Sequence, residues 1–320
     1  MWRERTARRT TAGWLTAILI AALVAGRNAA AVPGTSGPAG ASGLPQPDHV
    51  VIVVEENKSF SDIIGNSHAP YINALAHQGA LFTRSFAVAH PSEPNYLALF
   101  SGSTHNVTDD SCPHTFKGTN LASELFGKGL TFGMYSQGLP EVGYTGCSAK
   151  AYWRKHNPAV NWQGADLPRF ANMPFLLFTI VPGKYDHLPT VSMVAPDQDH
   201  DMHDGSIKQG DTWLKTHIAP YVQWARTHNS LLIVTWDEDD GSGDNRIPTL
   251  FVGPMVKPGT YRQRIDHYSV LRTVTAMYGL DAPGKSAHAD PIRGVWIKGA
   301  PGPAGTPLST SHRSRRSTRP

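Results

Sequence analysis

Acidic and amide side chains directly follow two short apolar runs, residues 49–54 and 231–235. A carboxylate that follows a buried strand costs free energy unless it is exposed to water or binds a partner such as a metal ion. Carboxylate and amide oxygens are the ligands that hard divalent cations prefer. The two groups could share one metal ion, and a pair of solvated acidic turns is the alternative. The side chains concerned are Glu56, Asn57, Asp237 and Glu238.

A serine lies near the start of a helical pattern in residues 90–102, HPSEPNYLALFSG. Pro94 fits the first turn of a helix, so Ser92 is predicted to precede that helix. Free backbone N–H groups and the helix dipole favour an anionic phosphate at such a place. Ser92 is therefore a candidate nucleophile, and a serine that only caps the helix is the alternative.

Residues 196–205, PDQDHDMHDG, concentrate histidine and aspartate behind another apolar run. This density is typical of a metal site, although a polar loop with capping aspartates has the same composition. A further histidine precedes the last predicted helix. The candidates from these two places are Asp199, Asp201, His203 and His267.

Strand-like and helix-like patterns alternate along the chain, and the corresponding elements must position these groups. The predicted strands are residues 49–54, 189–195, 231–235 and 249–252, and the predicted helices are residues 71–78, 120–128, 207–227 and 269–278. This alternation predicts an α/β fold with a mostly parallel central sheet and helices on both faces. Ligand sites in such sheets lie beyond the carboxyl ends of the strands, where the candidate residues are found.

The composition divides the chain into four parts. Residues 1–31 have a basic start, a short apolar stretch and an Ala-Ala-Ala end, which predicts a signal peptide of the Sec rather than the twin-arginine type. An uncleaved N-terminal anchor is the alternative. Residues 32–46 predict a flexible linker, residues 47–299 one folded domain, and residues 300–320 a disordered basic tail.

The formal net charge of +4 is concentrated at the two ends of the chain. Residues 1–31 contain five Arg and one Glu, and the tail after Ala300 contains four Arg, so each end carries +4. The body between them carries about −4, which predicts no basic face for nucleic acid. The chain has two cysteines, Cys112 and Cys147. Two thiols in an exported protein usually pair, and two free buried thiols are the alternative.

Four segments taken together are long and specific: residues 90–102, DMHDGS at 201–206, NSLLIVTWDEDDG at 229–241 and YWRKHNPAVN at 152–161. They resemble the phosphoesterase family of bacterial acid phosphatases and phospholipases C, within the alkaline-phosphatase-like superfamily. The resemblance extends over residues 49–296 and implies an alkaline-phosphatase-like fold. It also implies a secreted acid phosphatase that acts on phosphate monoesters, phosphatidylinositol 3-phosphate among them.

The resemblance implies a role for each candidate residue. Ser92 would form a phosphoserine beside a divalent cation (Mg²⁺, Ca²⁺, Mn²⁺ or Zn²⁺) held by Glu56, Asn57, Asp237 and Glu238. A second cation, where present, would be held by Asp199 or Asp201 with His203 and His267, and a single-metal site is the alternative that the Glu56–Asn57 pair suggests. The other catalytic candidates are His203, His267 and His90, as proton donors to the leaving group, and Asn95. A second phosphate or a headgroup would be bound by Arg154, Lys155 and His156, for which a solvated basic loop is the alternative.

Two other functions use parts of the same site. A phospholipase C-type phosphodiesterase needs the same nucleophile and cation, so it is the main alternative. A non-catalytic surface module that binds metal or lipid headgroups is the second, and a nucleophile at a helix start argues against it. The expected partners are phosphorylated small molecules or phosphoinositide headgroups, with peripheral contact to a lipid surface, and a monomer is expected.

Overall fold

The computed structural model describes residues 43–162, 167–180 and 185–297. The predicted signal peptide, residues 1–31, and the predicted tail, residues 300–320, lie outside these residues. Only residues 43–46 of the predicted linker lie inside them, and Leu44 among these is buried in the core. No helix within the described ranges is long and apolar enough to cross a membrane.

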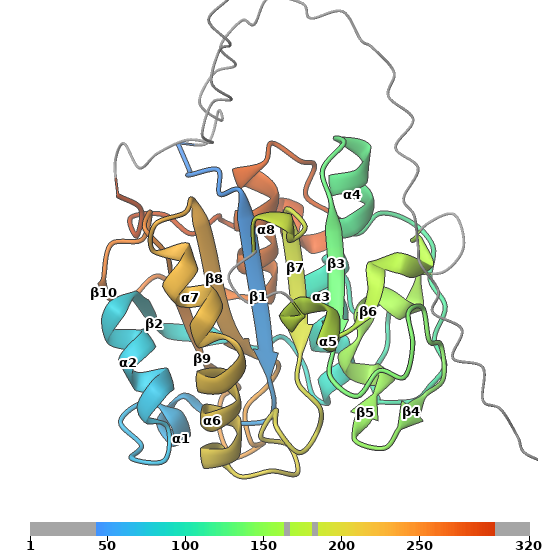
Figure 1. The fold of residues 1–320 in the computed structure, drawn as a ribbon, viewed down its shortest axis with the longest axis horizontal. Coiled ribbons are helices and arrows are strands. Elements are labelled where there is room, and N and C mark those ends of the chain that lie inside the picture. Colours follow the sequence, from blue (N-terminus) through green and yellow to red (C-terminus); the bar gives the residue numbers. More distant parts are fainter. Residues whose placement is uncertain (1–42, 163–166, 181–184, 298–320) are drawn as a thin grey trace, which may run out of the picture. The chain divides into compact units, whose positions relative to one another are not determined.

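A mixed, mostly parallel sheet forms the centre of the domain (Figure 1). Within the described residues it has nine strands, in the order β10-β2-β9-β8-β1-β7-β3-β6, with β11 also paired to β2. Its strands are β1 (His49–Glu55), β2 (Ala80–Phe86), β3 (Phe132–Ser136), β6 (Asn172–Pro174), β7 (Val191–Ala195), β8 (Ser230–Trp236), β9 (Arg246–Val252), β10 (Gly259–Tyr261) and β11 (Ile265–Asp266). A separate hairpin joins β4 (Ser148–Ala149) and β5 (Tyr152–Trp153).

The strands β8, β1, β7, β3 and β6 run parallel, which confirms the predicted sheet. The strand β9 runs antiparallel to both of its neighbours, β8 and β2. Its residues from Ile247 to Val252 are all buried, as in a parallel strand, because both of its faces are covered. Burial therefore explains the pattern at β9, and the pattern alone carries no information about direction.

Helices cover both faces of the sheet, as predicted (Figure 1). On the near face in Figure 1 lie α1 (Phe60–Ile63), α2 (Pro70–Gln78), α5 (Leu176–Thr179), α6 (Ile207–His217) and α7 (Ala219–Ala225). The opposite face packs against α3 (Ser92–Ser101), α4 (Leu121–Gly127) and α8 (His267–Met277). Short 3₁₀ turns are η1 (Arg154–His156), η2 (Pro158–Asn161), η3 (Arg169–Ala171), η4 (Tyr185–His187) and η5 (Gly284–His288).

The central strand β1 shows how the two cores are divided. Val50, Ile52 and Val54 pack on the face of α3 and α8, and Val51 and Val53 pack on the face of α2 and α6. This alternation follows from the two-residue period of a strand. A rigid, doubly covered strand thus carries the residues that follow it to a fixed place.

The predicted helix 207–227 is two helices, α6 and α7, that meet at Ile218. Pro220 lies in the first turn of α7, where a missing backbone N–H is tolerated. In the interior of one long helix the same proline would remove a hydrogen bond and clash with the preceding turn. The proline therefore sets the boundary that the apolar period alone does not show.

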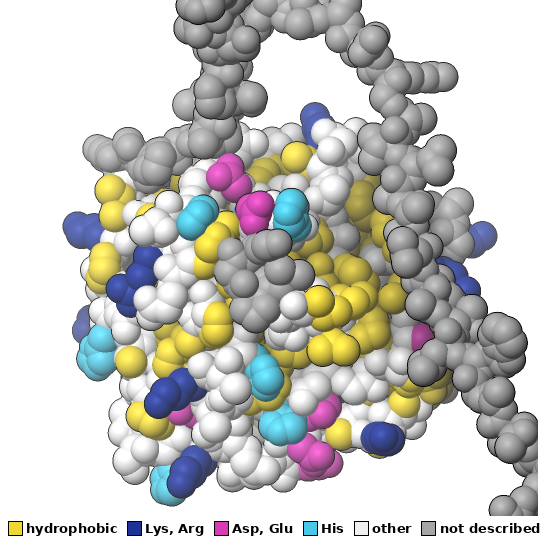
Figure 2. Space-filling model, in the orientation of Figure 1, with side chains coloured by type: hydrophobic (Ala, Val, Ile, Leu, Met, Phe, Trp, Pro, Cys, Tyr) yellow, Lys and Arg dark blue, Asp and Glu magenta, His cyan; other side chains and the backbone are white. Residues whose placement is uncertain are grey.

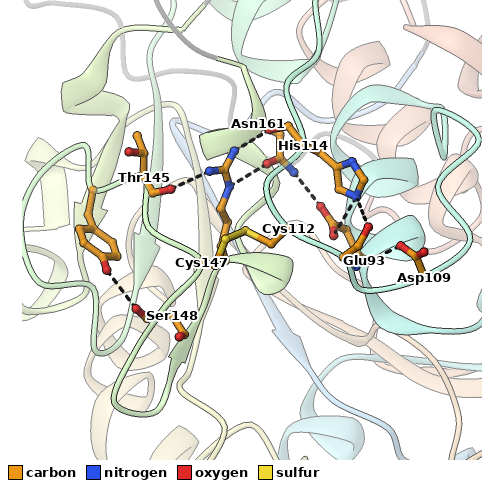
Figure 3. Close-up of a disulfide and its surroundings, with 11 residues drawn as sticks. Glu93, Asp109, Cys112, His114, Thr145, Cys147, Ser148 and Asn161 are labelled. Atoms are coloured by element: carbon orange, nitrogen blue, oxygen red, sulfur yellow. Dashed lines mark hydrogen bonds and ion pairs between the residues drawn. A yellow bond between two sulfur atoms is a disulfide. The ribbon is translucent and has the colours of Figure 1, made fainter.

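A disulfide between Cys112 and Cys147 fastens the segment that crosses from α3 to β5 (Figure 3). The two Cα atoms are 5.8 Å apart, and the disulfide agrees with the predicted pairing. Beside it, the buried guanidinium of Arg154 donates to the carbonyl oxygens of Thr145 and His114, each at 2.6 Å. The two loops joined by the disulfide are thus also joined by one arginine.

We predict that the double variant Cys112→Ser/Cys147→Ser folds with a lower free energy of unfolding. The disulfide closes a loop with a sequence separation of 35 residues. Loop-closure entropy gives an expected loss of about 4 kcal/mol for a loop of this length. Urea unfolding followed by circular dichroism measures the change, and reduced wild type should unfold at the same urea concentration as the double variant. A loss below about 1 kcal/mol would contradict this role.

Candidate active site

The ends of β1 and β8 bring two pairs of predicted ligands together. The strands pair in parallel register, with Glu55 opposite Trp236, so the residues that follow them are neighbours. The backbone N–H of Asn57 donates to Asp237 Oδ1 at 3.0 Å, and its side-chain amide lies 3.4 Å from Glu238 Oε1. Residues 180 positions apart in sequence are thus in direct contact at the carboxyl edge of the sheet.

Ser92 is the first residue of α3, and Pro91 is the N-cap. The prediction that Ser92 precedes the helix is therefore wrong. Its buried hydroxyl Oγ lies 3.1 Å from Glu56 Oε2 and 3.3 Å from Glu238 Oε1. The hydroxyl therefore faces carboxylates from both strand ends. At the helix start the N–H of Glu93 is not free for an anion, because it donates to Asp110 Oδ1 at 3.0 Å.

Tyr96 is a site residue that the sequence reasoning missed. It lies one helical turn after Ser92, so both side chains point to the same side of α3. Its hydroxyl donates to Glu56 Oε1, and its ring stacks on that of His156 with centroids 5.4 Å apart. The i, i+4 spacing from Ser92 is the signal that could have identified it.

His156 lies between two buried carboxylates. Its Nε2 is 3.2 Å from Glu56 Oε1, and its Nδ1 is 3.2 Å from Asp201 Oδ2. One ligand atom from each of these three side chains lies within 4.8 Å of the others, so they could hold a metal ion. The sequence analysis predicted that His156 binds the substrate. Its position between Glu56 and Asp201 favours a role as a ligand of the cation. The solvated basic loop proposed as an alternative is wrong, since all three residues of η1 are buried.

Burial makes the carboxyl groups of this cluster hard to ionise. It raises the pKa of Asp237 and of Glu238 to about 7, and it raises the pKa values of Glu56 and Asp201 well above normal. The neighbouring carboxylates contribute in the same direction, whereas the ammonium of Lys155 lowers the pKa of Glu56. A bound divalent cation would compensate this repulsion and displace the protons.

Three buried oxygens at the cluster accept no hydrogen bond: Asn57 Oδ1, Asp237 Oδ2 and Asp201 Oδ2, the last of which has only the 3.2 Å ion-pair contact with His156 Nδ1. Such atoms are costly unless they bind something. Carboxylate and amide oxygens together with an imidazole suit Mg²⁺, Ca²⁺, Mn²⁺ or Zn²⁺. The donor set therefore fits a divalent cation.

His267 is buried at the start of α8 but is poorly suited to donate a proton to a leaving group. Its Nε2 is 2.6 Å from the carbonyl oxygen of Asp237, and a carbonyl only accepts, so this nitrogen carries the proton. Burial lowers the pKa of the ring, and Nδ1 has no hydrogen-bond partner. The predicted role of His267 as proton donor is therefore replaced by that of a neutral ring with a free lone pair.

Three other residues that were predicted to bind the metal or the substrate, or to act in catalysis, have different positions or partners in the structure. Asp199 is exposed in the turn after β7, away from the buried cluster that contains Asp201. The side chain of Asn95 accepts from the N–H groups of Val88 and Ala89 and so holds the loop before α3. The guanidinium of Arg154 is used within the disulfide-linked loops.

His203, His90 and Lys155 lie at the edge of the cluster. The ring of His203 is 6.3 Å from that of His156, and its side chain is 29% exposed. His90 Nδ1 contacts Glu238, and the His90 side chain is 45% exposed. Lys155 Nζ lies 2.9 Å from Asp110 Oδ2, and its positive charge lowers the pKa values of Glu56 and Glu238. These three side chains are placed where a substrate could meet them.

The arrangement of sheet and helices is similar to that of solved structures from the alkaline phosphatase superfamily and its relatives. A superfamily member from Vibrio parahaemolyticus aligns with a TM-score of 0.56 at 14% identity, covering 77% of this chain and 70% of that one. A phosphonate monoester hydrolase from Silicibacter pomeroyi aligns with a TM-score of 0.51 at 11% identity, covering 77% and 76%. At these identities the likeness shows the fold, and it confirms the predicted fold class.

Sequence comparison gives the family. The phosphoesterase family matches residues 66–281, and the chain belongs to this family. A phosphatidylinositol-3-phosphatase from Mycobacterium tuberculosis is 53% identical over 257 residues, which cover 80% of this chain and 85% of that protein. A phosphate-repressible acid phosphatase from Penicillium chrysogenum is 29% identical over 252 residues, which cover 74% of this chain and 60% of that protein.

We predict that divalent cations stabilise the folded protein through this cluster. Saturation at about 100 times the dissociation constant contributes about 2.7 kcal/mol. For a domain of this size that is a rise in melting temperature of about 5 to 10 °C. Melting curves after exhaustive EDTA dialysis, with each cation added back, measure the shift.

The matched variants are Asp237→Asn, which removes a buried ligand, and Asp199→Asn, which changes an exposed carboxylate outside the buried cluster. The shift should shrink in the first and persist in the second. A shift lost only in Asp199→Asn would contradict Asp237 as a ligand and would favour a cation site that includes Asp199.

Proposed function

We propose that this protein is a secreted phosphomonoesterase in which Ser92 is the nucleophile. The observation that carries the proposal is the placement of the Ser92 hydroxyl against Glu56 and Glu238, inside a cluster that fits a divalent cation. The names of the relatives, a phosphatidylinositol-3-phosphatase and acid phosphatases, support hydrolysis of phosphate monoesters. The disulfide supports export, because such bonds persist in oxidising compartments.

The reaction follows from the groups around Ser92. Its oxygen attacks phosphorus and forms a phosphoserine, while the bond from phosphorus to the alcohol oxygen breaks. The proton of the hydroxyl passes to a carboxylate of the cluster, Glu56 or Glu238, both within reach of Oγ. Water then attacks phosphorus, releases inorganic phosphate and restores the serine.

A divalent cation held by Glu56, Asn57, Asp237 and Glu238, with His156 and Asp201 beside them, would offset the charge of the phosphate and favour ionisation of the serine. The departing alcohol oxygen needs a proton. His203 and His90 are placed to supply it, since each has an accessible ring, whereas His267 is buried and its proton is donated to the carbonyl oxygen of Asp237. An imidazolium donor favours activity at mildly acidic pH.

Lys155 is the proposed ligand for a substrate phosphate or headgroup, in place of Arg154. Phosphoinositide headgroups are the proposed substrate class, by likeness to the mycobacterial relative. Exposed apolar side chains support peripheral contact with a lipid surface, and apolar atoms gather near α5 in Figure 2. The exposed large apolar residues between positions 142 and 180 are Val142, Trp153, Phe170, Leu176, Leu177 and Ile180.

We predict that Ser92→Ala folds normally and retains less than about 10% of the wild-type rate on an aryl phosphate. Steady-state rates measure the loss, and circular dichroism checks the fold. Ser67→Ala, at an exposed position, is the control and should retain full activity. A rate near wild type in Ser92→Ala would eliminate Ser92 as the nucleophile. Release of diacylglycerol instead of inorganic phosphate from a phospholipid would indicate the phosphodiesterase.

We predict that Asp110→Asn raises KM about 10-fold and leaves kcat within about 3-fold. Asp110 holds Lys155 Nζ at 2.9 Å and the N–H of Glu93 at 3.0 Å, so it fixes the ammonium to the nucleophile helix. A hydrogen bond to a charged group is worth about 1.5–3 kcal/mol, which sets the size of the effect. Asp109→Asn, at the exposed neighbouring position, is the control. An unchanged KM in Asp110→Asn would remove Lys155 from substrate binding.

A further inference from the structure

Two side-chain-bearing residues at the site have left-handed backbone conformations. Asn57 has φ 48° and Met202 has φ 80°. Asparagine tolerates this region, whereas methionine rarely adopts it. Each residue lies next to groups of the site: Asn57 follows Glu56, and Met202 stands between Asp201 and His203. Such conformations persist only where the surrounding structure holds them.

Lys58 contacts both left-handed residues. Its Nζ donates to the carbonyl oxygen of Asn57 at 3.0 Å and to the carbonyl oxygen of Met202 at 2.8 Å. Within the described part of the chain, no carboxylate forms an ion pair with Lys58. The ammonium is therefore directed to two carbonyl groups rather than to the acidic cluster next to it.

The two turns are also linked through the backbone. The N–H of Glu56 donates to the carbonyl oxygen of Asp201 at 2.8 Å, and the N–H of His203 donates to Asp201 Oδ1 at 2.8 Å. The side chain of Met202 is fully buried against α6, where an added Cβ at Gly210 would lie 2.6 Å from two of its atoms. Met202 thus points into the core, while Asp201 remains beside His156.

We propose that Lys58 is a positioning residue that fixes the turn after β1 to the turn after β7. By holding both carbonyl groups, its ammonium keeps Glu56 and Asn57 on one turn aligned with Asp201 and His203 on the other. This role concerns the site of the proposed phosphatase and rests on that function only for its effect on the reaction rate. A small misplacement of such groups lowers a rate strongly, by about 100-fold for a displacement of about 1 Å.

The experiment compares Lys58→Met, Lys58→Gln and Lys58→Arg with wild type. The control is Lys128→Met, an exposed lysine just after α4, close to the amino-terminal end of β3. Hydrogen–deuterium exchange by mass spectrometry is followed in peptides covering residues 56–60 and 200–205. In Lys58→Met, exchange should become faster in both peptides, and kcat should fall about 10-fold or more while KM stays within about 3-fold.

Lys58→Arg should restore slow exchange and most of kcat, since a guanidinium also donates to carbonyl groups. Lys58→Gln keeps a neutral and shorter donor group and should be intermediate, which provides the comparison if Lys58→Met does not fold. Unchanged exchange in both peptides would overturn the proposal, and so would faster exchange with unchanged kcat. If wild type did not hydrolyse phosphate monoesters, the proposed function would fail, and the exchange data would still decide whether Lys58 joins the turns.

Discussion

The repulsion among Glu56, Asp201, Asp237 and Glu238 is the constraint on which the rest of the site depends. Parallel pairing of β1 with β8 and β7 places these carboxyl groups at one edge of the sheet, under cover of helices. Burial removes the water that would otherwise separate their charges. The hydroxyl groups of Ser92 and Tyr96, the ring of His156 and the ammonium of Lys155 all face this region. Each supplies a proton or a positive charge that the carboxyl groups lack.

Two kinds of structure hold this arrangement in place: the covered strands of the sheet and the disulfide-linked loops. Rigid strands, covered on both faces, deliver Glu56, Asp201 and Asp237 to fixed positions. The loops around Cys112 and Cys147 lie outside the main sheet, and they are held instead by the disulfide and by hydrogen bonds (Figure 3). Beside them, Arg154 donates to Asn161, which in turn donates to Glu93 next to the nucleophile. The disulfide and these hydrogen bonds thereby fix the position of the loops, as backbone hydrogen bonds between strands fix the sheet.

The parts of the site that follow buried strands could be predicted from the sequence. Polar groups after an apolar run must either be exposed or used, and parallel strands share an edge, so Glu56 and Asp237 were expected to meet. The same logic gave four strands of the sheet, β1, β7, β8 and β9, and its longer covering helices. It did not give the strands β3, β6, β10 and β11, nor β2, whose Thr83 and Arg84 interrupt the apolar run, nor the end of α6, which depends on Pro220.

Other site residues could not be assigned correctly, because their environment is created only by tertiary contacts. Tyr96 reads as a core residue, and its hydroxyl acquires a role only because α3 crosses above Glu56. The side chains of Arg154 and His156 are two residues apart, yet one joins loops and the other joins carboxylates. His267 looked like a proton donor until its contact with the carbonyl of Asp237 fixed which nitrogen carries the proton.

The contact between Ser92 and Glu238 spans 146 residues of the chain, and that between Ser92 and Glu56 spans 36. Contacts of such long range form late in folding, because the closure entropy of the intervening chain must be offset first. No fragment that lacks either strand can therefore assemble the nucleophile with its carboxylates. Turnover therefore requires the ends of both β1 and β8 to be in place beside α3.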